Sequence, residues 1–409
     1  MNDVSHEDDL DLFDADEIDE SPEEKPRRTW QIWALVAVVV LLLGGGAYYG
    51  VGRVLGVGYF GDYSGDGDGD VLVHVQDGAS TKAIGSMLAD AGVVRSARAF
   101  VNAASGDDRI ASLHPGYYVM KTAMSGRAAE ARIADPASRV GNVQIQGGLQ
   151  LSDLHNPDNS VKSGILSLLA NASCVTLNGK QTCTQVRDLQ QAAATADPAE
   201  LGVPDWALPA VAKADPAHRL EGLIVAGVYD VKPGSDAREL LKTVLTASAA
   251  TLSAVRVPAP GGESTVALPA LSKDTGLTPY QVLQVASLIE REAIASDFAK
   301  VSRVTYNRLA VGMPLQYDST INYELDRPLI ATSDADRNRA GPYNSYQNTG
   351  LPPTPISSPS QAALVAAAKP AEGTWLYFVK CDKDGNSCFA NTQAEHDANV
   401  RKARDAGAF

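Results

Sequence analysis

The chain has 409 residues, of which 44% are hydrophobic, and its formal net charge at pH 7 is −14. This length and composition allow two or three domains with apolar cores. The acidic charge is concentrated at the start, because residues 1–31 carry twelve Asp or Glu side chains against three Lys or Arg. The sequence has no basic patch of the kind that nucleic acids require, so we expect no nucleic-acid partner.

The first seventy residues contain a tail, a hydrophobic span and a linker. Residues 1–31 are acidic and poor in large apolar side chains, which predicts a disordered tail. Residues 32–52 carry no charge and match the ~20 residues that cross a bilayer as a helix. Basic side chains are more numerous before this span than after it, which predicts a single-pass cell-membrane protein with a cytoplasmic N-terminus and an extracytoplasmic remainder. A cleaved signal peptide is the alternative, and residues 53–70, rich in Gly and Asp, are interpreted as a solvated linker.

Residues 71–139 are predicted to form a small α+β module. VLVHVQ alternates like a strand, and Ser80-Thr81 can cap a helix that runs to Gly92. A second helix fits RSARAFVNAAS, a second strand HPGYYVMK, and a third helix SGRAAEARIA. This order of elements resembles the LysM-like module of some cell-wall enzymes, and a small spacer domain is the alternative interpretation.

Residues 140–409 are predicted to form the larger domain, also α+β. VGNVQIQGG is typical of a strand, and helical patterns follow at 184–195 and 235–253. The Pro- and Gly-rich VPAPGGESTVALPA is interpreted as a loop. Thr278-Pro279, with Gln281 three residues after Thr278, predicts a helix start with a capping box, and this helix is expected to run to about Ala295.

Four cysteines occur as two close pairs. Asn178-Gly179 and Asp384-Gly385 are strong two-residue hairpin turns. With these turns as the loops, Cys174 falls opposite Cys183 and Cys381 opposite Cys388. Two local disulfides are therefore predicted, which implies an oxidising compartment. Free thiols or a four-cysteine metal site are the alternatives, and the absence of a Cys-x-x-Cys pair argues against metal.

The segment ASLIEREAIAS contains two glutamates on the predicted helix. At about 100° per residue, Glu292 lies within the apolar arc that Val285, Ile289 and Leu288 define, whereas Glu290 lies about 160° from Glu292 and beyond the edge of that arc. A carboxyl on an apolar stripe either pairs with a buried base or sits in a cleft with a raised pKa. The second environment is the one that a general acid in glycoside chemistry needs.

Residues 286–400 resemble the endolytic murein transglycosylase family, the MltG or YceG-like group. The matching motifs include NRLAVGMPLQYD, YNSY and GLPPTPI in collinear order. The resemblance implies an enzyme that cuts peptidoglycan glycan strands internally at the MurNAc–GlcNAc β-1,4 bond and leaves 1,6-anhydro-MurNAc ends, and it suggests cell-wall synthases as partners. The family's catalytic glutamate is the second of its Glu-x-Glu pair, which corresponds to Glu292. No metal and no cofactor are expected.

Other matching positions are expected to contact the sugar, although a structural role remains open for each. The expected substrate-binding residues are Asn307, Gln316, Asp318, Tyr343, Asn344, Tyr346 and Glu221. Glu290 is expected to support the site through a structural salt bridge or a contact behind it, and His396 matches a family position without an assigned role.

The chain departs from the family pattern at several places. Gln146 stands where members commonly have an acidic residue, and the stretch after Glu221-Gly222 lacks the family's Phe-Pro-Asp. A family histidine is replaced around Ser387-Cys388. The Glu292 region is intact, so these departures concern the substrate groove more than the reaction. A non-catalytic wall-binding or division-complex protein is the alternative function, and a hydrolase that uses water as the nucleophile is a third.

Overall fold

A computed structural model of the chain describes residues 61–408 except 157 and 326–331. These residues belong to one compact unit, Gly61–Phe409. The predicted tail and hydrophobic span lie outside the described residues. Among the helices of the described part, none combines the length and hydropathy that a bilayer crossing needs. Short antiparallel strands alternate with helices, which confirms the mixed α+β class.

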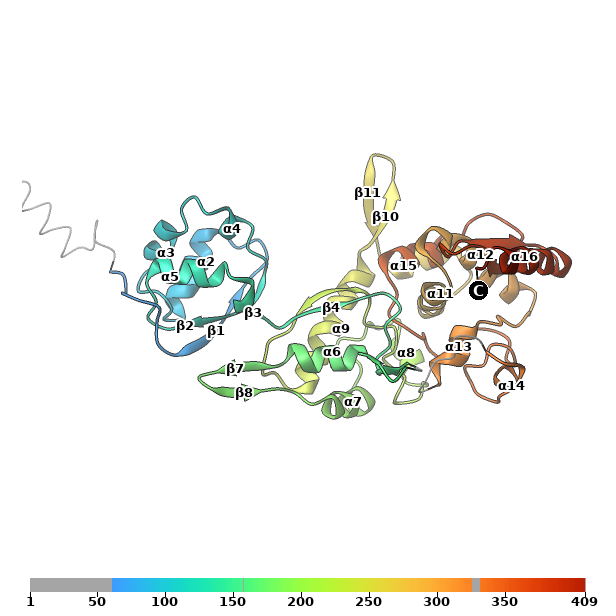
Figure 1. Cartoon of the computed structure of the whole chain (residues 1–409), viewed down its shortest axis with the longest axis horizontal. Helices are drawn as coiled ribbons and strands as arrows, with labels where there is room; N and C mark the ends of the chain where they lie inside the picture. Colours follow the sequence, from blue (N-terminus) through green and yellow to red (C-terminus); the bar gives the residue numbers. More distant parts are fainter. Residues whose placement is uncertain (1–60, 157, 326–331, 409) are drawn as a thin grey trace, which may run out of the picture. The chain divides into compact units, whose positions relative to one another are not determined.

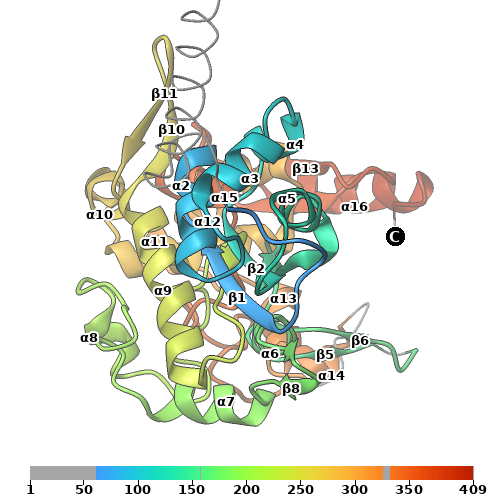
Figure 2. The same cartoon turned by 90° about the vertical axis from the view of Figure 1, so that its left-hand side faces the viewer.

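The first part of the described chain is a three-stranded antiparallel sheet with helices packed on it (Figure 1, Figure 2). Val73 lies opposite Tyr118, and both side chains are buried under the helices. The strands, in the order β1-β2-β3, are β1 (Asp70–Val75), β2 (Gly116–Lys121) and β3 (Arg139–Val140). The helices are α2 (Thr81–Asp90), α3 (Ala97–Ala103), α4 (Asp108–Ala111), α5 (Gly126–Ile133) and the 3₁₀ turn η1 (Pro136–Ser138).

Local sequence signals explain these helices. The hydroxyls of Ser80, Ser96 and Ser125 each accept a hydrogen bond from the backbone N–H three residues on, as N-cap residues do. The three predicted helices are thus present, and the short helix α4 was not predicted. The module has its own apolar core, formed by residues between Val73 and Ile133.

The described part of the predicted linker, residues 61–69, contacts the module, although most of its residues are exposed. The carboxylate of Asp62 accepts a hydrogen bond from the Gly126 N–H at 3.0 Å. The backbone of Asp66 pairs with that of Met124 in an isolated antiparallel β-bridge. Gly67 lies so close to the Thr122 carbonyl that a Cβ would be 2.5 Å from it. This segment therefore lies against the module, and the assignment of 53–70 as a linker stays a prediction.

The second part of the described chain, from residue 140 on, is mainly helical, with five two-stranded sheets. Its strands are β4 (Asn142–Ile145), β5 (Leu154–His155), β6 (Val161–Lys162), β7 (Val175–Leu177), β8 (Lys180–Thr182), β9 (Gly227–Asp230), β10 (Val255–Ala259), β11 (Gly262–Val266), β12 (Tyr377–Lys380) and β13 (Ser387–Ala390). Its helices are α6 (Ile165–Ala172), α7 (Val186–Thr195), α8 (Leu208–Val211), α9 (Ala237–Ser253), α10 (Leu268–Leu271), α11 (Pro279–Glu292), α12 (Phe298–Ala310), α13 (Asp318–Tyr323), α14 (Asp334–Arg337), α15 (Gln361–Ala368) and α16 (Gln393–Asp405), with 3₁₀ turns η2 (Ser272–Asp274) and η3 (Ala295–Asp297).

Helix α11 is the central element of this part. Every residue from Val282 to Ile289 is buried, and the helix packs against α15, α12 and α13. A helix that is apolar over most of its surface belongs in a core, and some of its polar side chains bond to other segments. For example, Ser287 Oγ accepts from the Ile356 N–H at 3.1 Å. This burial fixes the C-terminal end of α11 firmly.

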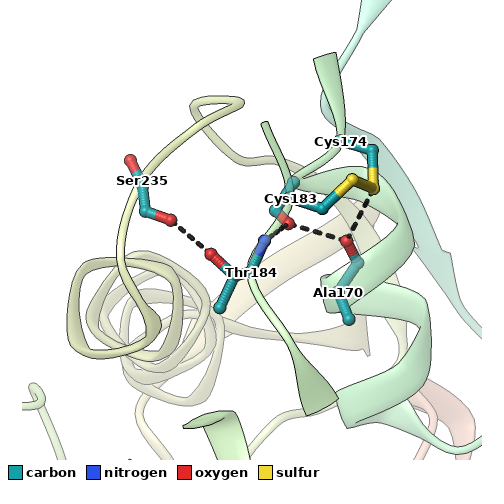
Figure 3. The surroundings of a disulfide bond; sticks show 6 residues. Ala170, Cys174, Cys183, Thr184 and Ser235 are labelled. Carbon is teal, nitrogen blue, oxygen red and sulfur yellow. Dashed lines mark hydrogen bonds between the residues drawn. A yellow bond between two sulfur atoms is a disulfide. The ribbon is translucent and has the colours of Figure 1, made fainter. Parts of the chain in front are cut away.

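The first cysteine pair behaves as predicted. Asn178 and Gly179 both have positive φ, and Leu177 lies opposite Lys180 in the β7–β8 hairpin. The structure joins Cys174 to Cys183. Figure 3 shows this disulfide beside the chain segment in which Thr184 Oγ1 donates to the Ser235 carbonyl oxygen at 2.6 Å.

The second cysteine pair is also joined, Cys381 to Cys388, but the predicted register is wrong by two residues. Val379 lies opposite Cys388, and the Cys381 N–H donates to the Asn386 carbonyl. The loop has four residues because Asp382 Oδ1 accepts from the Asn386 N–H at 3.0 Å, which is turn chemistry that competes with the two-residue turn.

The prediction of a Pro- and Gly-rich loop at VPAPGGESTVALPA is wrong for most of that stretch. Residues 255–259 and 262–266 form the β10–β11 hairpin, which projects from the helices (Figure 1, Figure 2). Pro258 is tolerated because this two-stranded ribbon has free edges. The glycines of this stretch form the hairpin turn, and Pro258 lies in a strand with a free edge.

Candidate active site

Helix α11 ends at Glu292. The predicted capping box is present at its start, where Thr278 Oγ1 accepts from the Gln281 N–H and Gln281 Oε1 accepts from the Thr278 N–H. At the other end Ala293 has extended dihedrals, φ −145° and ψ 170°. The helix is thus three residues shorter than the predicted end near Ala295, and Glu292 stands where the chain leaves the helix.

The carboxyl of Glu292 is partly buried and faces the N-terminus of α13. Its Oε1 accepts a hydrogen bond from the Ser319 N–H at 3.3 Å, one of the amides that a helix leaves free in its first turn. Burial raises the pKa of Glu292 to about 7; hydrogen bonds from Ser319 oppose the rise, the Asp318 charge adds to it, and Arg291 opposes it. Near neutral pH this carboxyl can therefore give or take a proton.

Glu290 has different hydrogen-bond partners from Glu292. Its Oε2 accepts from the Ser360 N–H at 2.9 Å, at the N-cap of α15. A Cβ on Gly147 would lie 2.1 Å from Glu290 Oε1, so a larger residue there would displace the Glu290 carboxyl. Between the two glutamates, Arg291 donates through Nη1 to the Gly148 carbonyl oxygen at 3.0 Å. The supporting role of Glu290 in catalysis stays a prediction, and its contacts join α11 to α15.

Two predicted site residues meet beside Glu292. Asp318 Oδ1 accepts from Tyr346 OH and from Thr332 Oγ1, each at 2.6 Å, and Arg337 Nε lies 3.8 Å away. Burial, then the hydrogen bond to Asp318, raises the pKa of Tyr346, so its hydroxyl remains a donor. The structure thus gathers Asp318 and Tyr346 into one hydrogen-bonded group at the start of α13.

Gln316 lies in the loop that leads into α13. Its side chain is exposed, and its φ of +54° is uncommon for a residue other than glycine. The loop is held by backbone contacts, since the Gln316 N–H donates to the Ser345 carbonyl and the Tyr317 N–H donates to Ser345 Oγ. A strained residue that neighbouring contacts hold in place is frequent at functional sites.

Three predicted substrate-binding residues lie in the interior. Tyr343 is 3% exposed, and its hydroxyl forms a hydrogen bond with Thr354 Oγ1. The Asn344 side-chain amide donates to the backbone carbonyls of Arg337 and Arg339. Glu221 is 2% exposed. These side chains hold the fold around the site in this structure. Direct contact with a glycan stays a prediction for them, and it would require them to leave the interior.

Asn307 and His396 are placed by the C-terminal hairpin. The Asn307 amide donates to the carbonyl oxygens of Gly373 and Trp375, so it anchors the segment before β12. The ring of His396 stacks on Tyr377 at 5.4 Å, and burial lowers the pKa of His396. Neither contact reaches Glu292, and the sugar-binding role of Asn307 stays a prediction.

Sequence reasoning missed two groups that contact or neighbour Glu292. Ser319 was not singled out, although it follows Asp318 in the QYDST motif and its amide is free because a helix starts there. Arg291 falls about 100° from Glu292 on the helical wheel, on its polar side. In the structure it is nevertheless partly buried, and burial lowers its pKa. Its position between two glutamates was the available signal.

Within the described ranges, no group of three or more His, Cys, Asp or Glu side chains could hold a metal ion. The donors around Glu292 and Asp318 are the Ser319 amide, the hydroxyls of Thr332 and Tyr346, and the Arg337 guanidinium. The expectation of a reaction without metal or cofactor stays a prediction.

Residues 73–402 match the model of the YceG-like family, so the chain belongs to that family. Two curated proteins named endolytic murein transglycosylase are similar: one from Streptococcus pneumoniae (strain D39), 33% identical over 189 residues, and one from Bacillus subtilis (strain 168), 38% identical over 129 residues. The matches cover 45% and 30% of this chain, and they span only about a third of each relative, 32% and 34%.

One solved structure is also similar, a putative YceG-like protein from Listeria monocytogenes. Its match covers 80% of this chain and 98% of that chain, with 23% sequence identity and a TM-score of 0.49.

Proposed function

We propose that this protein is a membrane-anchored, endolytic peptidoglycan lytic transglycosylase. The observation that carries the proposal is the carboxyl of Glu292, which is held at the end of a buried helix with a pKa of about 7. Two further points support it, namely family membership and the name endolytic murein transglycosylase that the curated relatives bear. The substrate is a peptidoglycan glycan strand.

One glutamate can serve both steps of this reaction. Glu292 first gives its proton to the glycosidic oxygen as the C1–O bond of MurNAc breaks. The C6 hydroxyl of the same sugar then attacks C1, and its proton passes to the Glu292 carboxylate. A 1,6-anhydro ring forms, no water is consumed, and Glu292 returns to its acid form. Because the nucleophile is intramolecular, its effective concentration is high, and the second carboxylate of ordinary glycosidases is dispensable.

The neighbours of Glu292 suit this cycle. The Asp318 charge favours the protonated form that begins the reaction, whereas the Ser319 N–H stabilises the carboxylate that appears after the first proton transfer. The exposed side chain of Gln316 and the partly exposed Tyr346 are the predicted site residues best able to meet a sugar without rearrangement.

The location and the small module belong to the same proposal. Residues 32–52 would anchor the chain in the cell membrane with residues 1–31 cytoplasmic, so that the enzyme meets nascent glycan outside the membrane. The two disulfides support an oxidising compartment. The helices packed on a small sheet support a LysM-like module at 71–139. Cell-wall synthases are the partner class that this location favours.

The test is digestion of purified glycan strands, stripped of peptides, by the full chain in detergent. We expect internal cuts with 1,6-anhydro-MurNAc ends, and a fall in rate of roughly 10²–10⁴ for Glu292→Gln. Glu290→Gln, two residues earlier, is the comparison variant, and its loss of activity should be much smaller because Glu290 is expected to support the site without transferring a proton. Reducing MurNAc ends would identify a hydrolase, and equal activity in Glu292→Gln, or none in the parent, would favour the non-catalytic alternative.

A further inference from the structure

Glu221 is a buried carboxyl that the proposed reaction does not use. It is 2% exposed, and it accepts from the Leu151 N–H at 3.2 and 3.3 Å and from Tyr323 OH at 3.1 Å. Burial raises the pKa of Glu221 to about 7. A buried carboxylate is costly, so its presence between three chain segments calls for a reason beyond packing.

One route from Glu221 to Glu292 is geometric. Tyr323 is the last residue of α13, and it is 8% exposed with its ring 4.8 Å from that of Tyr343. The hydrogen bond from its hydroxyl to Glu221 therefore fixes the far end of a six-residue helix. The near end of the same helix supplies the Ser319 N–H to Glu292. A short helix moves as a unit, so the position of Tyr323 decides where that N–H points.

A second route is electrostatic and passes through Arg291. This guanidinium is held by the Gly148 carbonyl and is partly buried. The charges of Glu292 and of Glu221 both favour its protonated form. Arg291 therefore interacts with two carboxyls, and each negative charge weakens the effect of the cation on the other.

We propose that Glu221 is a positioning residue for Glu292: its carboxyl holds α13 where the Ser319 N–H meets Glu292, and its negative charge offsets that of Arg291 beside Glu292. Glu221 touches neither substrate nor reacting atoms in this assignment. The inference rests on the proposed function for its meaning in catalysis, but its effect on Glu292 can be measured without catalysis.

Other charged and titratable groups near Glu292 also affect its protonation. Asp318 on α13 favours the protonated form and is itself paired with Arg337 and bonded to Tyr346. The hydroxyls of Tyr317 and Tyr346 stay neutral over the working range, because burial raises the pKa of both. Changing Glu221 alone leaves all these groups in place.

The decisive variant is Glu221→Gln, which keeps an acceptor for Tyr323 OH and removes the charge. Above pH 7, where Glu221 is ionised, Arg291 would then act on Glu292 without its counter-charge, and the pKa of Glu292 would fall. Since the reaction starts from protonated Glu292, we expect the alkaline limb of the kcat/KM profile to move to lower pH, by roughly half a unit to one unit. An unmoved limb would overturn the electrostatic route.

Variants of Arg291 give the opposite sign. Arg291→Met removes the cation, so the limb should move to higher pH, and the double variant with Glu221→Gln should fall between the two single variants. Arg291→Lys keeps a positive charge and should restore the limb to near the parent position. Tyr323→Phe keeps every charge but removes the hydrogen bond that fixes the far end of α13. It should lower kcat, whereas an unchanged kcat would overturn the geometric route.

A stability measurement separates this inference from the proposed function. A carboxyl whose folded pKa lies above its unfolded value destabilises the fold as it ionises. The Tm of Glu292→Gln should therefore exceed that of the parent increasingly from about pH 4.5, and the difference should level off near pH 7. When Glu292→Gln is instead compared with its parent in a chain that carries Glu221→Gln, the difference in Tm should level off at a lower pH. Glu324→Gln, one residue beyond Tyr323, removes the same charge from a side chain that faces Gly341 and should leave the levelling pH unchanged.

If the full chain cuts no glycan yet the levelling pH shifts as expected, the proposed function fails and the coupling of Glu221 to Glu292 stands. If glycan is cut and neither the limb nor the levelling pH moves, the proposed function stands and the charge role of Glu221 is wrong.

Discussion

The small module and the region around α11 bury different kinds of side chain. The module's core is formed by apolar residues such as Phe100 and Met120, both fully buried, and Arg109, which pairs with Asp107, is exposed. In the described part of the chain, the charged residues that are buried, Glu221, Asp297 and Arg308, all belong to the second part. One part is thus built for stability, and the other retains polar groups that stability alone would not select.

The energetic reason is desolvation. A buried charge must recover its lost hydration from hydrogen bonds, which Arg308 does with the carbonyl oxygens of Leu315 and Leu376 and with the rings of Tyr317 and Tyr377. Such networks hold a loop in one arrangement rather than maximise stability. This arrangement is what keeps Gln316 and the start of α13 in place beside Glu292.

The largest effect on this contrast is expected from Phe100→Ala. Removing a fully buried aromatic ring leaves a cavity and should lower the stability of the module by about 3–5 kcal/mol. Native-state hydrogen exchange in β1 and β2 measures the loss. Because the module has its own core, amides of α11 should keep their protection, and equal loss in α11 would show that the two parts share one stability.

A smaller effect is expected from Arg308→Met. The carbonyls of Leu315 and Leu376 would lose their donor, which should cost about 1–3 kcal/mol. Exchange of amides in residues 313–318 should quicken, and glycan cleavage should slow because the loop before α13 loosens. Arg238→Met, an exposed arginine on α9, is the control and should change neither. Unchanged exchange in 313–318 would mean that Arg308 does not hold the loop.

The smallest effect is expected from Arg109→Ala in the module. Arg109 is 63% exposed and pairs with Asp107 and Glu130, and its hydrogen bonds hold the pKa of Asp107 below its usual range. A depressed carboxylate pKa contributes stability only above that pKa, and solvent screens it here. The Tm at pH 7 should not change measurably, and a fall as large as that of Phe100→Ala would remove the contrast between the two parts.

Much of the local structure could be predicted because short-range signals decide it. Ser80 and Thr278 cap helices through their own hydroxyls, and Asn178-Gly179 selects a two-residue turn. The second cysteine hairpin could not be predicted in register, since Asp382 and Asp384-Gly385 offer two competing turns of similar strength. The inequivalence of Glu290 and Glu292 was predictable, because helical periodicity alone separates them.

By itself, the sequence determined the secondary structure around the site, the cysteine partners and the glutamate that differs from its neighbour, since each depends on residues close in the chain. Only the tertiary structure decided that Ser319 and Asp318 face Glu292, that Tyr343 and Asn344 lie inside, and that Glu221 reaches Tyr323 across 102 positions. The pKa of a carboxyl depends on burial and on charges brought from distant segments, and packing alone sets both.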